Sequence, residues 1–307
     1  MINTGINLVN KMLLMVGMLV FPGLIIAQGK PGNKDNSASG NNQTLLWKVT
    51  SPHFPGPSYI FGTMHILCEN DAKLSDSLKN IIKNIDKIYF EVDLDNMTEM
   101  MGAIRHFNMK GDKTLNDLLS KEDYQRLDSF LKANKVMLPL QMMNKFKPVF
   151  ISSMLAQSML SCEKTNGMEM LIMSEAQQYE IEIAGLETLE YQAGIFDSIP
   201  YEEQSKMLMS YVDSLENYKD MSQTLAEAYL NQDLEKLDDL MINSDPAMLK
   251  YLDLLLYNRN RNWIDPMLSQ MVEKPALFAV GAGHLPGEEG VLALLVKRGY
   301  TVTPVKN

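Results

Sequence analysis

Hydrophobic positions along the chain follow two periods, which predict strands near both ends and helices between them. Residues 45–51 and 58–61 are short apolar runs separated by a Pro- and Gly-rich turn, a pattern typical of paired strands. Residues 71–85 carry apolar side chains at helical spacing, and the run 87–94 then predicts another strand. The folded part of the chain is therefore expected to begin with a strand pair, a helix and a strand.

The middle of the chain has the spacing of helices. From 97 to 160 the pattern predicts helices interrupted at Pro139 and Pro148. A helix over 167–179, a strand over 181–186 and a helical stretch over 201–274 that breaks around Asp245 and Pro246 complete this part. Most of the middle of the chain is thus expected to be helical.

The two ends contain a weak internal repeat. The first unit is a strand over 59–61, the sequence Gly62-Thr63-Met64-His65, the helix over 71–85 and a strand over 87–93. The second unit is a strand over 276–280, the sequence Gly281-Ala282-Gly283-His284, a helix over 288–298 and a strand over 300–305. Each unit predicts a βαβ crossover, right-handed if its strands are parallel. We therefore expect an α/β fold with a central mixed sheet built from two strand-GxxH-helix-strand units, covered by a large helical insertion over about 97–274.

The repeat gives two glycines and two histidines equivalent places. Gly62 and Gly281 fall where a strand ends, where the backbone turns or approaches another group closely. His65 and His284 follow three residues later, at the carboxyl end of a strand, where α/β sheets bind ligands. A hydrogen-bonded structural histidine is the alternative for each of them, and the repetition makes a shared site the better interpretation.

Two carboxylates complete the candidate site. Glu91 interrupts an apolar strand, where a carboxylate must be paired, hydrogen-bonded or bound to metal, and Glu187 ends the strand over 181–186. An edge strand with a solvated carboxylate is the alternative for Glu91, and a helix-capping or loop acid is the alternative for Glu187. Two histidines and one or two carboxylates suit Zn²⁺, Mn²⁺ or Co²⁺ with an open position for water.

Composition and missing motifs exclude several classes of function. Hydrophobic residues make up 46% of the chain and charged residues 21%, which indicates a globular protein rather than a disordered chain or a protein with many membrane spans. The net charge of −10 argues against nucleic-acid binding. The sequence has no HExxH, GxSxG, Walker or GxGxxG motif.

The N-terminal segment resembles an export signal. A polar stretch ending in Lys11 precedes the uncharged apolar run 12–26, which is short for a bilayer span, and small residues follow it. We expect a signal peptide over 1–27, a flexible linker over 28–44 and one domain over 45–307, in an exported protein of the periplasm or the extracellular space. An uncleaved anchor is the alternative, and it would be the protein's only contact with a membrane.

Export changes the interpretation of the two cysteines. Cys68 and Cys162 are the only cysteines, and an oxidising compartment permits a disulfide between them. Two buried free thiols are the alternative. No CxxC motif is present, which argues against thioredoxin-like redox chemistry.

Five segments carry a resemblance to a known family. They are FGTMH ending at His65, YFEVD around Glu91, GLET around Glu187, NRNRNW starting at Asn258, and VGAGHLPGEEGVLALLVKRGY starting at Val280. In this combination the chain resembles the TraB/GumN family, which is related to the TIKI and PrgY proteins. The resemblance implies an α/β core related to erythromycin esterase-like and ChaN-like folds, and a peptidase site that depends on Mn²⁺ or Co²⁺.

The resemblance also assigns residues. It places the paired histidines at His65 and His284 and the strand glutamate at Glu91. The Arg-Asn pair of the family maps onto Arg259 and Asn260, although Arg261 repeats the pattern one step later.

Two hypotheses follow for the function. In the first, the protein is an exported metal-dependent peptidase acting on a peptide or protein: His65, His284 and Glu91 hold the ion, Glu91 or Glu187 acts as general base, and Arg259 stabilises the oxyanion. In the second, the same site binds a peptide, a metal or haem without turning it over.

Overall fold

A computed structural model describes residues 43–307 except 137, 157–158 and 244–248. The expected signal peptide, nearly all of the linker and the break at Asp245 and Pro246 lie outside the described residues, so they stay predictions. In the part of the chain that is described, no helix is long and apolar enough to cross a membrane.

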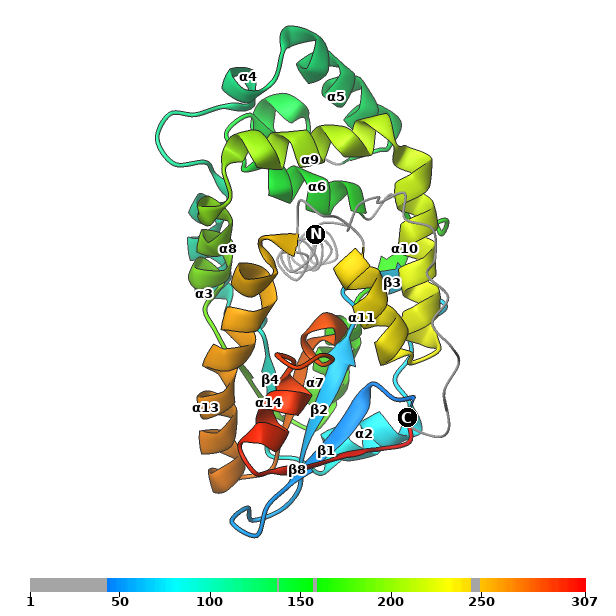
Figure 1. Ribbon diagram of the computed structural model, residues 1–307, viewed down its shortest axis with the longest axis vertical. Coiled ribbons are helices and arrows are strands. Elements are labelled where there is room, and N and C mark those ends of the chain that lie inside the picture. Colours follow the sequence, from blue (N-terminus) through cyan, green and yellow to red (C-terminus); the bar gives the residue numbers. More distant parts are fainter. Residues whose placement is uncertain (1–42, 137, 157–158, 244–248) are drawn as a thin grey trace.

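A mixed six-stranded sheet forms the centre of an α/β fold, as expected (Figure 1). Its strands are β1 (Leu46–Thr50), β2 (Ser58–Thr63), β4 (Lys87–Phe90), β6 (Glu182–Gly185), β7 (Ala276–Gly281) and β8 (Thr301–Pro304). Their order across the sheet is β6-β4-β7-β2-β1-β8. β6, β4, β7 and β2 are parallel, whereas β1 runs antiparallel to both β2 and β8.

The two GxxH units share this sheet. β2 of the first unit pairs with β7 of the second, with Thr63 opposite Gly281. β4 lies on the other side of β7, so the strands of the two units interleave. The repeated segments at the two ends of the chain therefore lie side by side at the centre of the molecule.

Each face of the sheet has its own helical cover. β7 is buried along its whole length. Its Leu277 and Ala279 belong to a core that includes residues of α2 (Asp76–Lys83) and α7 (Met168–Gln178). Phe278 and Val280 belong to the opposite core, formed with α13 (Asn258–Glu273) and α14 (Val291–Lys297). This alternation follows from the two-residue period of a strand buried on both faces.

The insertion between β4 and β7 is mostly helical and has a core of its own. Its helices besides α7 and α13 are α3 (Met97–Ala103), α4 (Leu115–Leu118), α5 (Lys121–Ala133), α6 (Pro148–Ala156), α8 (Leu189–Ile195), α9 (Tyr201–Asp213), α10 (Leu215–Leu230) and α11 (Leu234–Asn243). α4, α5, α6 and α9 gather at the end of the molecule away from β8 (Figure 1). The insertion also supplies β6 at the edge of the sheet, so it extends the sheet as well as covering it.

Two details differ from the sequence predictions. The strand expected over 87–94 ends at Phe90, because the backbone bends there and passes so close to Gly185 that a Cβ on that glycine would lie 2.6 Å from the Asp93 amide nitrogen. A second, two-stranded sheet of β3 (Leu67–Cys68) and β5 (Thr165–Asn166) had no signal in the sequence pattern.

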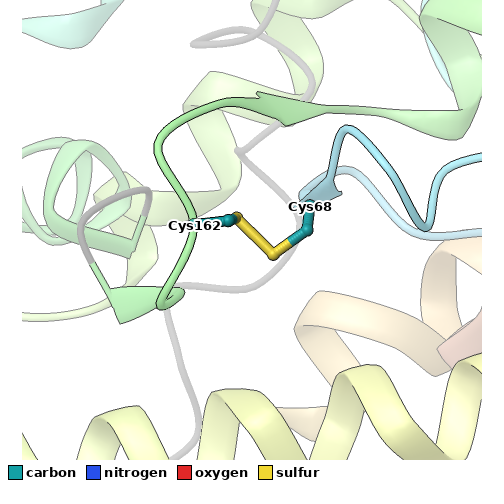
Figure 2. The surroundings of a disulfide bond; sticks show 2 residues. All are labelled: Cys68 and Cys162. Atoms are coloured by element: carbon teal, nitrogen blue, oxygen red, sulfur yellow. A yellow bond between two sulfur atoms is a disulfide. The ribbon is translucent and has the colours of Figure 1, made fainter.

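A disulfide ties these two short strands together. It joins Cys68 of β3 to Cys162, three residues before β5, with a Cα–Cα distance of 5.8 Å (Figure 2). The linked segments continue directly into the loop that carries His65 and into the start of α7. The disulfide therefore connects the insertion to the first GxxH loop.

Candidate active site

The candidate site lies at the carboxyl ends of the four parallel strands. His65 follows β2, Glu91 follows β4, Glu187 follows β6 and His284 follows β7. Because parallel strands end at the same edge of a sheet, these four side chains are brought together although His65 and His284 are 219 positions apart in the sequence. The structure thus collects every histidine and carboxylate that the sequence proposed for the site.

Glu91 is the central carboxylate. It is 5% exposed, which removes the alternative of an edge-strand acid in solvent. Its Oε1 accepts a hydrogen bond from the Gly281 amide at 2.8 Å, and its Oε2 accepts one from Arg259 Nη2 at 2.6 Å and one from Gln192 Nε2 at 3.1 Å. Burial raises the pKa of Glu91, but the positive charge of Arg259, together with the histidines and the Gly281 amide, outweighs it and lowers the pKa to about 2.

Arg259 is the cation that compensates the buried carboxylates. It is 2% exposed, and its Nε and Nη2 donate to Glu187 Oε1 at 2.9 and 2.6 Å. Its Nη1 donates to the Leu255 carbonyl at 3.0 Å, which belongs to a π-helical turn over Asp253–Tyr257. Every nitrogen of the guanidinium therefore has a protein acceptor, so Arg259 holds carboxylates rather than facing an open site.

Glu187 completes this buried ion pair. Its Oε2 accepts a hydrogen bond from Trp263 Nε1 at 3.0 Å, and its carboxylate is 7% exposed. Burial raises the pKa of Glu187 despite the opposing charge of Arg259. The carboxylate follows β6 in a loop, but its contacts are those of an interior residue rather than a solvated loop acid.

His284 is a neutral interior histidine. Its Nδ1 lies 2.6 Å from Asn260 Oδ1, and Asn260 Nδ2 donates to the Glu289 carbonyl at 2.8 Å. Since the amide oxygen can only accept, His284 carries its proton on Nδ1 and turns the Nε2 lone pair toward Arg259 Nη1, 3.2 Å away. Burial, with a smaller effect of Arg259, lowers the pKa of His284 to about 3.

His65 has the opposite electrostatics. Its Nδ1 lies 2.6 Å from Glu169 Oε1 in the first turn of α7, and its side chain is 18% exposed. Burial lowers the pKa of His65, but Glu169 and, less strongly, Glu91 outweigh it and raise the pKa above its ordinary value. Glu169 thus places a negative charge beside Nδ1, and Nε2 is the ring nitrogen that faces the space at Gly281.

Gly281 leaves space where three of these groups converge. A Cβ on Gly281 would lie 3.1 Å from Glu91 Oε1, 3.5 Å from His284 Cδ2 and 3.7 Å from His65 Nε2. Gly62 is also tightly placed, with a virtual Cβ 3.1 Å from Ala282. Both glycines thus have the close-approach role that the sequence predicted.

The residues predicted as metal ligands do not form a ligand set in this arrangement. Across the described chain, no three or more His, Cys, Asp and Glu side chains are grouped so as to hold a metal ion. The guanidinium of Arg259 touches both Glu91 and His284 Nε2, so a cationic side chain already neutralises the acid and occupies the lone pair. The donor set therefore does not fit a divalent ion without a rearrangement of Arg259.

Three residues in the site were not predicted. Glu169 and Gln192 come from helices α7 and α8 of the insertion, and Trp263, although part of the quoted NRNRNW segment, had no assigned role. The sequence did contain a pattern that could have indicated Arg259. Arg259, Trp263 and Met267 follow one another at four-residue spacing, which places them on one face of a helix, and all three are buried. Arg261 lies off this row and is 41% exposed, bound to Glu289 and Asp253.

A small cavity lies beside His65. It has a volume of about 20 Å³ and is lined by His65, Glu91, Glu169 and Gln192 together with apolar side chains. The buried Gln192 Oε1 has no hydrogen-bond partner among the described residues. Because a water needs roughly 10–15 Å³ and polar partners, this cavity has the size and the chemistry to hold one water.

Comparisons with known proteins find distant relatives. Metalloprotease TIKI2 of Danio rerio is 21% identical over 315 residues, covering 84% of this chain and 60% of the relative. Metalloprotease TIKI1 of Danio rerio is 22% identical and covers 89% of this chain and 66% of the relative, and the human TIKI1 is 22% identical with 90% and 65% covered. The chain thus spans about two thirds or less of the length of these relatives.

The sequence profile of the TraB/PrgY/gumN family matches residues 45–304. No solved structure matches the chain, so nothing links its fold to the erythromycin esterase-like or ChaN-like folds that the resemblance implied. The matched segment contains all four strand ends that build the site. The chain belongs to the TraB/PrgY/gumN family.

Proposed function

We propose that this protein is an exported hydrolase that cleaves peptide bonds at the paired GxxH site. The observation that carries the proposal is the His65–Glu169 pair, which lies beside a water-sized cavity and next to the space that Gly281 leaves free. The names of the relatives, metalloproteases, support a peptide or protein substrate.

His65 is the acid–base group in this proposal. Its Nε2 takes a proton from the water held near Glu91 and Gln192, and the water oxygen attacks the carbonyl carbon of the peptide bond. Glu169 places its negative charge beside Nδ1 and stabilises the protonated ring. The protonated Nε2 then gives its proton to the amide nitrogen as the C–N bond breaks, so the peptide leaves as a carboxylate and an amine.

Glu91, Arg259 and His284 are positioning residues. Arg259 fixes Glu91 and the His284 ring, and Glu91 in turn accepts a hydrogen bond from the Gly281 amide, next to the space that this glycine leaves free. The relatives are named metalloproteases, which indicates that those proteins use a metal ion. We derive no step through a metal, because the donor set described above does not fit one.

The test is peptide cleavage by the purified chain. A mixture of unmodified peptides is incubated with the wild type, with His65→Gln and with the control His53→Gln, which alters an exposed turn. Mass spectrometry should show new termini with wild type and control, and a rate at least about 100-fold lower with His65→Gln, because acid–base catalysis typically contributes that much. Peptide that is bound but not cleaved, or equal cleavage by all three proteins, would contradict the proposal and favour a non-catalytic binding role.

A further inference from the structure

A larger cavity opens next to His65 and His284. Its volume is about 170 Å³, and the two GxxH segments form one of its walls. Helices α6, α10 and α11 of the insertion, together with Leu160 after α6, form the rest of its described lining. The site histidines thus lie at the boundary between the sheet and a cavity that the insertion completes.

Each helix presents one face to this cavity. α10 contributes Ser222, Leu225 and Tyr229, and α11 contributes Leu237 and Met241, all at helical spacing. α6 adds two more residues, Ser153 and Ala156. The cavity is therefore built by regular packing of three helices against the GxxH loops.

The lining is apolar and has no charge apart from the histidines. Among the described residues that line it there is no Asp, Glu, Lys or Arg. The Tyr229 hydroxyl donates to the Gly62 carbonyl at 2.9 Å, and the Ser153 hydroxyl donates to the Val149 carbonyl at 3.0 Å, so both are already used. The Thr63 hydroxyl, on a residue 2% exposed, lines the cavity and has no partner in the described part of the chain.

The size of the cavity indicates what it can take. An apolar protein cavity of roughly 150 Å³ binds benzene, so about 170 Å³ accommodates an aromatic or branched aliphatic side chain. An ammonium group would lose its water there and find no carboxylate among the described lining residues. A carboxylate would lose its water as well and would meet a positive charge only where protonated His65 forms part of the wall, so neither group suits the apolar interior of the cavity. The unpartnered Thr63 hydroxyl suits one hydrogen bond to a peptide backbone.

We propose that this cavity is the subsite for a large apolar side chain, aromatic or branched aliphatic, next to the bond that the enzyme cleaves. The inference rests on the proposed hydrolysis, because His65 would act at the edge of the same cavity. The insertion therefore selects the substrate, whereas the sheet carries the reacting groups.

Two peptide-like probes test the subsite apart from catalysis. N-acetyl-phenylalanine amide and N-acetyl-aspartate amide are titrated calorimetrically against the wild type and against Leu225→Trp, which fills the cavity. The matched control is Leu230→Trp, the same substitution on the same helix at a side chain that is 45% exposed and lies outside the cavity. Ser222→Phe is a second filling variant in case Leu225→Trp does not fold.

We expect the phenylalanine probe to bind the wild type and Leu230→Trp at least about 100-fold more tightly than the aspartate probe. Leu225→Trp and Ser222→Phe should lose this preference. Equal binding of both probes, or a preference that survives both filling variants, would overturn the subsite.

Cleavage assays with Phe or Asp at the same peptide position separate the two proposals. Cleavage without a preference for Phe would overturn the subsite and leave hydrolysis standing. Selective binding of the phenylalanine probe without cleavage of any peptide would support the apolar site and contradict the proposed hydrolysis.

Discussion

Replacing Arg259 with Met tests whether the buried guanidinium holds the site together. Arg259 is 2% exposed and donates to Glu91 Oε2 and Glu187 Oε1, each at 2.6 Å. A methionine of similar length fills much of the space but leaves two carboxylates in the interior without their cation. We therefore expect a large loss of stability rather than a local adjustment.

The magnitude follows from the burial of the partners. Removing one member of a buried ion pair costs about 3–5 kcal/mol, because the remaining charge is left uncompensated. Here two carboxylates are left, both at most 7% exposed, so the upper part of that range applies. Glu187→Gln combined with Arg259→Met should recover part of the loss, because it removes one of the two uncompensated charges.

Arg261→Met is the matched control. Arg261 lies two residues away on the same helix and also binds two acidic residues, Glu289 and Asp253, but it is 41% exposed. Exposed pairs contribute up to about 1 kcal/mol, so this variant should remain close to the wild type.

Urea unfolding followed by circular dichroism, with all variants at the same pH, measures the free energies. A loss of less than about 1 kcal/mol for Arg259→Met, equal to that of Arg261→Met, would refute the buried ion-pair network.

Two other predictions concern the disulfide and the binding of Mn²⁺. Reduction of the Cys68–Cys162 disulfide, or replacement of both cysteines by serine, should lower the free energy of unfolding by about 4 kcal/mol. The reason is that the disulfide closes a long loop, because its cysteines are 94 residues apart in the sequence. An unchanged midpoint of urea unfolding would contradict this prediction. Equilibrium dialysis should show Mn²⁺ binding far below one ion per chain in wild type and increased binding in Arg259→Met, which frees two carboxylates. One tightly bound ion in wild type that is lost in a His65→Ala/His284→Ala variant would contradict the arrangement and restore the predicted metal site.

Features fixed by local sequence were predictable. The existence and order of the main strands and helices and the position of the GxxH loops follow from period and turn residues, and the repeat correctly indicated that His65 and His284 share one sheet edge. Glu187 was located for the same reason, since it follows β6, which is parallel to β4 and β7. Glu91 was predicted inside its strand, and the structure places it directly after β4, which ends at Phe90.

Features set by long-range packing were not predictable. The partners Glu169 and Gln192 depend on how the insertion docks on the sheet, which no local period encodes. The choice between Arg259 and Arg261 depends on which face of α13 is buried. Arg259 shares a face with Trp263, but the sequence alone did not show that this face packs against the sheet. No local pattern shows either that Arg259 contacts Glu91 and His284 Nε2, two of the three predicted metal ligands.

The central claim is that Glu169 tunes His65 as the general base. The most direct test is the pH dependence of kcat/KM for peptide cleavage by wild type and Glu169→Gln. Only the unprotonated Nε2 can take a proton from water, so activity should rise with pH, with a wild-type midpoint above 6.5 because Glu169 raises the pKa of His65. Glu169→Gln removes that charge and leaves the lowering effect of burial, so its midpoint should move to lower pH and its maximal rate should fall. The same midpoint in both proteins, or an unchanged rate, would contradict the account.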